Sequence, residues 1–135
     1  MNLSEKNAVE QATNNFYAAL NLLFTGDDQP MQNVWSHADD VVYMGPDGLY
    51  LIGWTEISKM WSKVAEMKLG GTVIPINSHT IIGSDISMIT CVESGENEIQ
   101  GKSESVGIRS STVFRKENNA WVVIAHQTDL LAFMK

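Results

Sequence analysis

The chain has 135 residues, a length that fits one domain with a buried core and room for one ligand cavity. Its 16 acidic residues against 9 lysines and arginines give a formal net charge of −7, which disfavours binding to phosphate backbones or anionic lipid. With one cysteine, no signal peptide and no apolar run of the roughly 20 residues that cross a bilayer, the sequence predicts a cytoplasmic protein with no nucleic-acid and no membrane partner.

The first predicted element is a helix. Apolar residues recur at intervals of three and four between Ser4 and Gly26, and a glycine commonly follows the end of a helix. The carboxylates and the proline of residues 27–30 are typical of a helix start, so we expect a short second helix over residues 31–36.

A hairpin and a third helix follow. Two runs of β-branched and aromatic residues, 41–44 and 49–52, flank the turn sequence Gly-Pro-Asp-Gly, which predicts an antiparallel pair. After Gly53, the apolar residues between positions 57 and 65 recur with helical spacing, and Gly70 with its neighbouring glycine ends the run. This pattern indicates an amphipathic helix with one buried face.

The second half of the chain predicts strands over residues 72–82 and 86–93, a long polar loop over 94–102, and a hairpin over 106–129 that turns at 117–120. Helices therefore gather early in the chain and antiparallel strands late. This order, α-α-β-β-α-β-β-β-β, predicts a single α+β domain over 1–135, in which a curved sheet packs on the helices as a cone. The space between the two layers is a usual place for a small-molecule site.

Several segments together resemble a known family. They are Asp-Asp-Val-Val-Tyr-Met-Gly-Pro-Asp-Gly at 39–48, Gly-Trp-Thr-Glu-Ile at 53–57, Thr-Val-Phe-Arg-Lys at 112–116, and a final strand with Trp121 and a histidine. The chain resembles the SnoaL-like members of the nuclear transport factor 2-like superfamily, which includes ketosteroid isomerase. The resemblance implies a curved sheet, a conical pocket and frequent homodimers.

The resemblance can be compared with isomerase chemistry, which needs a carboxylate base and an oxyanion hole made by a tyrosine and a protonated aspartic acid. The positions that align with these three groups hold Gly45, Phe16 and Thr112. Tyr17 is one position from the aligned tyrosine, but a shift of one residue turns a helical side chain by about 100°. Steroid isomerase activity is therefore not expected.

Alternation along the final hairpin predicts which side chains face the cavity. If Thr112 faces inward, Ser110 and Phe114 do as well, and the same alignment turns Gln127 and Asp129 inward and His126 outward. We expect a ligand site lined by Phe16, Tyr43, Trp61, Thr112, Gln127 and Asp129. The alternative is that Thr112 and Gln127 only satisfy buried backbone groups.

Other polar residues have plainer interpretations. We expect His126 to pack beside Arg109 on the convex face, and His79 to be an ordinary half-exposed histidine. Asp39 and Asp40 fit a solvated turn better than an acid–base pair. Trp61, on the inner face of the third helix, is a core residue by default but has an indole N–H to offer a ligand. If the ligand is turned over, Asp129 is the expected base.

No glycine-rich phosphate loop, dinucleotide fingerprint, nucleophile elbow or metal-ligand spacing is present, so we expect no cofactor and no metal site. Two functions remain open. Either the cavity binds a small apolar or aromatic molecule and acts on it as an isomerase, cyclase or hydrolase, or the domain is a non-catalytic association module. In both cases Arg109, Val113 and Arg115 lie on a sheet face that no expected helix covers, which predicts a homodimer through that face.

Overall fold

The computed structural model describes residues 3–135, and its elements follow the order expected from the sequence. The helices are α1 (Leu3–Leu23), α2 (Gln29–Val34) and α3 (Trp54–Met67). The strands are β1 (Val42–Met44), β2 (Tyr50–Ile52), β3 (Thr72–Ile81), β4 (Ile86–Ile99), β5 (Lys102–Glu117) and β6 (Ala120–Thr128), and a short 3-10 helix, η1 (Ala132–Met134), closes the chain. The predicted α+β fold is confirmed.

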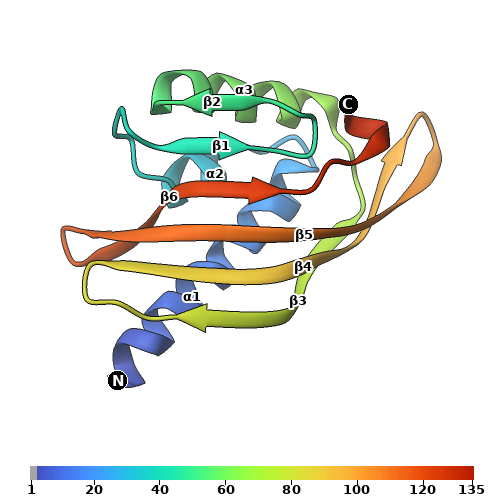
Figure 1. Cartoon of the computed structure of the whole chain (residues 1–135). Coiled ribbons are helices and arrows are strands. Elements are labelled where there is room, and N and C mark those ends of the chain that lie inside the picture. The colour runs from blue at the N-terminus through green and yellow to red at the C-terminus, as the bar shows by residue number, and fades with distance from the viewer. Residues whose placement is uncertain (1–2) are drawn as a thin grey trace.

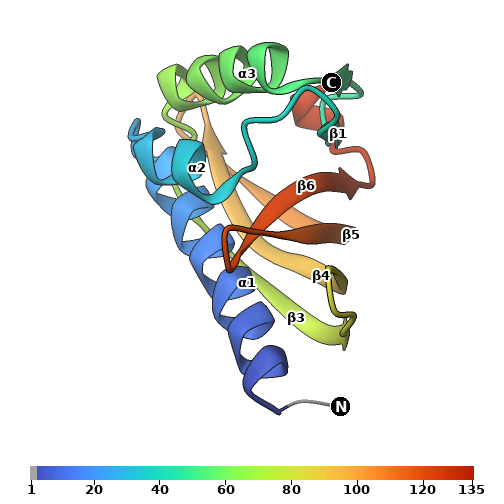
Figure 2. The same cartoon turned by 90° about the vertical axis from the view of Figure 1, so that its left-hand side faces the viewer.

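One curled, unclosed sheet holds all six strands in the order β2-β1-β6-β5-β4-β3 (Figure 1). Every neighbouring pair is antiparallel except β1 and β6, which are parallel. Figure 2 shows that the helices α1, α2 and α3 all lie on one side of this sheet. The opposite, convex face is covered by none of the helices in residues 3–135.

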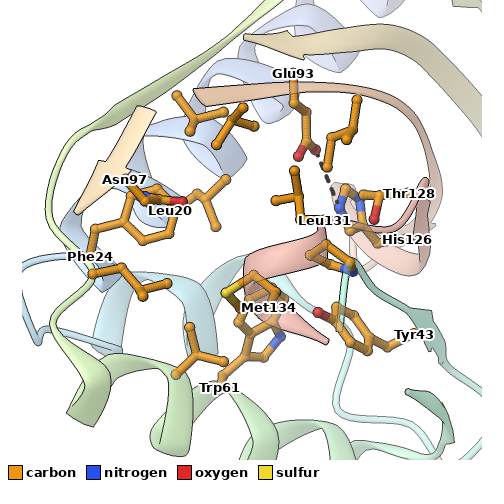
Figure 3. A pocket seen from close by; sticks show the side chains of 16 residues that line it. Leu20, Phe24, Tyr43, Trp61, Glu93, Asn97, His126, Thr128, Leu131 and Met134 are labelled. Atoms are coloured by element: carbon orange, nitrogen blue, oxygen red, sulfur yellow. Dashed lines mark ion pairs between the residues drawn. The ribbon is translucent and has the colours of Figure 1, made fainter. Parts of the chain in front are cut away.

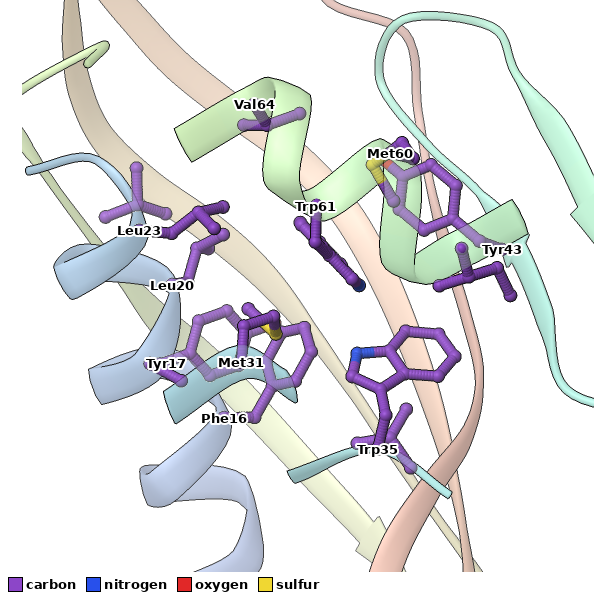
Figure 4. Packing of buried hydrophobic residues seen from close by; sticks show 14 of the residues in the cluster. Phe16, Tyr17, Leu20, Leu23, Met31, Trp35, Tyr43, Met60, Trp61 and Val64 are labelled. Carbon is purple, nitrogen blue, oxygen red and sulfur yellow. The ribbon is translucent and has the colours of Figure 1, made fainter. Parts of the chain in front are cut away.

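The core lies between the helices and the concave face of the sheet. Figure 4 shows side chains of α1, α2 and α3 meeting in this layer, with Phe16 and Leu20 facing Trp35 and Trp61. Burial of such large apolar side chains stabilises the fold by roughly 1.5–3 kcal/mol each, which makes this layer the main source of stability. The helix faces and the buried aromatic residues agree with the periodicity in the sequence.

The polar segment expected as a long loop is instead the end of a hairpin. β4 continues to Ile99 and β5 begins at Lys102, so that only Gln100 and Gly101 connect them. Both connecting residues have positive φ, of 52° and 80°, as a tight two-residue hairpin turn requires. The prediction of a loop over 94–102 was therefore wrong, because the polar composition of an exposed hairpin arm was taken for a connection.

A β-bulge changes which residues of β6 face the cavity. Phe114 pairs with Val123, whereas Val113 pairs with Ala125, so Ile124 is an extra residue on β6. Side chains alternate along a strand, and one extra residue therefore reverses the alternation beyond it. As a result His126 is buried, and the prediction that it points to the convex face was wrong.

No helix in residues 3–135 is long and apolar enough to cross a membrane.

Candidate functional site

A small cavity lies between α1, α3, the concave face of the sheet and the C-terminal segment (Figure 3). Its volume is about 50 Å³, enough for one or two water molecules. The walls are mainly apolar and include Leu20, Phe24, Val64, Val106, Leu131 and Met134. No lysine or arginine is among the residues that line it in the described part of the chain.

A buried contact between a carboxylate and an imidazole forms the polar end of this cavity. Glu93 of β4 and His126 of β6 are 5% and 4% exposed, and His126 Nε2 lies 3.4 Å from Glu93 Oε2. The Tyr17 hydroxyl donates a hydrogen bond to the same Glu93 oxygen at 2.8 Å. Figure 3 shows the Glu93 carboxylate directed into the cavity, with His126 beside it. Both contacts use Oε2, and Ser110 is a further hydrogen-bond partner of the carboxylate.

The neighbours of the pair hold both side chains in place. Thr112 Oγ1 lies 2.8 Å from His126 Nδ1, and the ring of Phe16 packs 4.8 Å from the imidazole, centroid to centroid. The Tyr17 hydroxyl also lies 3.3 Å from Cys91 Sγ. Because Thr112 occupies Nδ1, the Nε2 edge of the imidazole faces Glu93.

The electrostatics of the site keep Glu93 ionised and its tyrosine neighbour neutral. Burial by itself raises the pKa of Glu93, but the hydrogen bond and charge of His126 and the hydrogen bond of Tyr17 outweigh it, and the net pKa lies below the ordinary value of 4.5. Burial, followed by the charge of Glu93, raises the pKa of Tyr17 far above its usual range. Glu93 is therefore a carboxylate at neutral pH, and Tyr17 is a hydrogen-bond donor.

Tyr43 lines the cavity across from this pair. Burial, then the charges of Asp47 and Glu93, raises the pKa of Tyr43 well above its ordinary value, so its hydroxyl is neutral. A Cβ at Gly45 would collide with this hydroxyl. Gly45, which aligns with the isomerase base, therefore has no side chain that would clash with the Tyr43 hydroxyl.

The C-terminal segment closes the cavity. After β6, the Leu131 amide donates to the Pro46 carbonyl at 2.9 Å, and Leu131 and Met134 both enter the lining. None of the three residues of η1 is buried, and the Met134 amide donates to the Leu131 carbonyl at 3.0 Å. Leu131 and Met134 thus form part of the cavity wall at its C-terminal end.

The structure brings together part of the predicted site. Tyr43 and Trp61 line the cavity, and Phe16 and Thr112 are buried against His126 at its edge. Gln127 lies on the opposite, convex face beside Arg109, in an open hollow of about 480 Å³. The prediction that Gln127 faces the cavity was wrong, because the bulge at Ile124 reverses the alternation.

Asp129 is not the buried carboxylate expected from the sequence. It pairs with the guanidinium of Arg109 at 2.9 Å at the surface, and this pairing lowers the pKa of Asp129 to about 2. Asp129 does not line the cavity but lies with Gln127 and Arg109 at the open hollow, so its expected role as a base in the cavity was wrong.

Sequence reasoning missed Glu93, Tyr17 and the inward orientation of His126. One signal was available: Ile89, Cys91 and Glu93 alternate on the predicted strand, and the first two mark the buried face. A glutamate on the apolar face of a strand indicates a buried carboxylate. Within residues 3–135, no three His, Cys, Asp or Glu side chains are placed to share a metal ion.

Three solved structures match nearly the whole chain. A candidate dehydratase of the NTF2-like family from Streptomyces avermitilis has a TM-score of 0.82 at 17% identity, over 95% of this chain and 97% of that one. A candidate ketosteroid isomerase from Shewanella frigidimarina has a TM-score of 0.74 at 19% identity, over 90% and 94% of the two chains. The association domain of C. elegans CaMKII has a TM-score of 0.70 at 17% identity, over 95% and 99%.

At these identities the likeness shows the fold alone, and the three neighbours include both candidate enzymes and an association domain. No curated protein matches the chain. The sequence profile of the SnoaL-like domain matches residues 9–129, which is most of the chain. The resemblance inferred from the sequence is thereby confirmed, and the chain belongs to the family of SnoaL-like domains.

Proposed function

We propose that the domain binds a small, mainly apolar molecule in its cavity and moves a proton on it, with Glu93 as the proton acceptor. His126 and Tyr17 hold the Glu93 carboxylate through Oε2, and Oε1 meets the ligand. The proton of a ligand C–H or O–H group passes to Oε1, and its bonding electron pair stays on the ligand. A proton transfer of this kind is common to isomerases, cyclases and lyases.

The observation that carries the proposal is the buried Glu93–His126 pair at the end of an apolar cavity. Burial of a charged carboxylate costs desolvation free energy, and apolar side chains of similar volume often stabilise a fold as well or better. A titratable group with a shifted pKa in a cavity is accordingly a mark of function.

The apolar walls support the choice of ligand. They offer contact area but few polar groups, so affinity comes from burial of about 25 cal/mol per Å² and from shape. The cavity of about 50 Å³ is too small for a six-membered ring, since an apolar cavity known to bind benzene measures about 150 Å³. A ring-sized ligand therefore enters as Leu131 and Met134 move outward.

A benzisoxazole probe tests the proposal without knowledge of the natural ligand. In 5-nitrobenzisoxazole, a base removes the C3 proton, the C–H electron pair forms the nitrile, and the N–O bond breaks to give a coloured phenolate. We expect the protein to accelerate this ring opening by about 10²–10⁴-fold over buffer, the range of general-base catalysis.

The matched variants are Glu93→Gln and Glu98→Gln, which lie on the same strand, Glu98 being exposed. We expect Glu93→Gln to lose the acceleration and Glu98→Gln to keep it, with circular dichroism showing that both are folded. Equal rates for the parent and Glu93→Gln would reject Glu93 as the base.

A second candidate function, homodimeric association, is favoured by the convex face. Strand register places Ile76, Val92 and Arg109 side by side on this face, and Met88 pairs with Val113 two rows further along, beyond Thr90 and Ser111. Ile74, Ile76 and Ile86 are exposed. Isoleucines on an uncovered sheet face are usually buried by a partner, and a second copy of this chain offers the same surface.

Light scattering at micromolar concentration tests association. We expect the mass of a dimer for the parent and of a monomer for Ile76→Lys, whereas Leu49→Lys, an exposed leucine outside this face, stays dimeric. A monomeric parent would overturn the dimer.

A further inference from the structure

Two hydrogen-bond donors of the cavity have no acceptor in the described part of the chain. The indole nitrogens of Trp35, Trp61 and Trp121 are buried without a partner, and of these three only Trp61 lines the cavity. The hydroxyl of Tyr43 also lines the cavity and makes no hydrogen bond to a described residue, but it is not among the buried unpaired atoms, so solvent reaches it. Buried donors almost always have an acceptor, so the acceptor of the Trp61 indole comes from outside the described residues, and the Tyr43 hydroxyl is free to share it.

Tyr43 and Trp61 lie next to each other. Their rings meet edge to face, with centroids 5.3 Å apart. Figure 3 shows the Tyr43 oxygen and the Trp61 nitrogen at the same end of the cavity, across from the Glu93 carboxylate. The cavity thus has an acceptor group at one end and two neutral donors at the other.

We propose that Tyr43 and Trp61 together hold a carbonyl oxygen of the ligand, so that the ligands of this cavity are small, neutral, mainly apolar carbonyl compounds. A carbonyl oxygen has two lone pairs and accepts both hydrogen bonds. An ammonium group has no acceptor to offer, and a carboxylate would face Glu93 with no lysine or arginine in the lining to balance it. The remaining walls suit a hydrocarbon ring.

This inference deepens the proposed function and rests on it for the orientation of the ligand. With its oxygen at Tyr43 and Trp61, a ring-sized ligand extends toward Glu93, so the two ends of the cavity fix which carbon faces the carboxylate. The assignment of the donors itself concerns binding alone, and it can be tested without any turnover.

Cyclohexanone and methylenecyclohexane form a matched pair of probes, because they differ mainly in having C=O or C=CH₂. Their dissociation constants can be measured by NMR titration of the full-length protein. We expect the parent to prefer cyclohexanone, and Tyr43→Phe and Trp61→Phe each to reduce that preference by about three- to tenfold, the loss of one net hydrogen bond.

The quantity to compare is the ratio of the two dissociation constants. Trp61→Phe changes the cavity shape for both probes, and the ratio cancels that shared effect. Trp121→Phe is the control, because its indole nitrogen is equally buried and unpaired but lies outside the cavity. In the parent, the infrared band of ¹³C-labelled cyclohexanone should shift to lower frequency on binding, and the shift should shrink in Tyr43→Phe.

Failure of the two proposals can be told apart. If cyclohexanone does not bind, or if its preference is the same in the parent, Tyr43→Phe and Trp61→Phe, the donor assignment is overturned whatever the benzisoxazole assay gives. If the preference depends on both donors while Glu93→Gln opens benzisoxazole as fast as the parent, the carbonyl site stands and the role of Glu93 falls.

Discussion

At the scale of single residues, the site depends on how Glu93 is held as an anion. Without partners, a carboxyl this deeply buried would take up a proton, because desolvation penalises its charge. His126 and Tyr17 reverse this outcome, since both contact Oε2. The other carboxylates singled out in the sequence differ: Asp40 and Asp129 pair with arginines at the surface.

Glu93 should make the stability of the protein depend on pH. Its pKa in the folded chain lies below the ordinary value of 4.5. A carboxyl with a lowered folded-state pKa stabilises the fold fully above its unfolded-state value and loses this effect as the pH falls through the folded-state value. The free energy of unfolding, measured with urea from pH 7 to pH 3, should therefore fall more steeply in the parent than in Glu93→Gln.

Glu98→Gln serves as the control, because the exposed Glu98 lies on the same strand. A gap between the parent and Glu93→Gln that stays constant from pH 7 to pH 3 would show that Glu93 is not ionised by its neighbours.

The helices and strands were largely predictable from the sequence. Which side chains of β6 face the cavity was not. The helices follow from apolar spacing, and the inward face of Ser110, Thr112 and Phe114 follows from alternation along β5. On β6 the same rule failed at Ile124, because nothing in the sequence marks a bulge there. That one residue decides whether His126 or Gln127 reaches the cavity.

Among the elements, the segment after β6 contributes the part of the cavity wall that has to move in the proposed function. Leu131 and Met134 line the cavity, whereas the neighbouring Leu130 is 51% exposed. Because shorter side chains leave more room for a ring, Leu131→Ala and Met134→Ala should each lower the KM for 5-nitrobenzisoxazole severalfold. They should also reduce stability by about 1–2 kcal/mol, less than a core leucine costs, since both are only partly buried.

Leu130→Ala should change neither quantity. A higher KM in both Leu131→Ala and Met134→Ala would mean that these side chains hold the ligand rather than exclude it.

At the scale of the whole molecule, the two faces of one sheet carry the residues of the two candidate functions. Its concave side carries Glu93 and His126, and its convex side carries Ile76 and Arg109. The fold and the family were predictable because they depend on periodicity and on short structural motifs spread over the chain. The contact between Glu93 and His126 was not predictable, because the two residues lie on strands β4 and β6, which are separated by β5 in the sheet.

Chemical rescue tests the central claim, proton removal by Glu93, most directly. Glu93→Ala should lose the opening of 5-nitrobenzisoxazole and leave room for a small carboxylate beside His126 and Tyr17. Added formate should then restore the rate with saturation in Glu93→Ala, while Glu98→Ala and the parent respond no more than buffer does. If Glu93→Ala retains the parent rate, or if formate accelerates all three proteins equally, Glu93 is not the base.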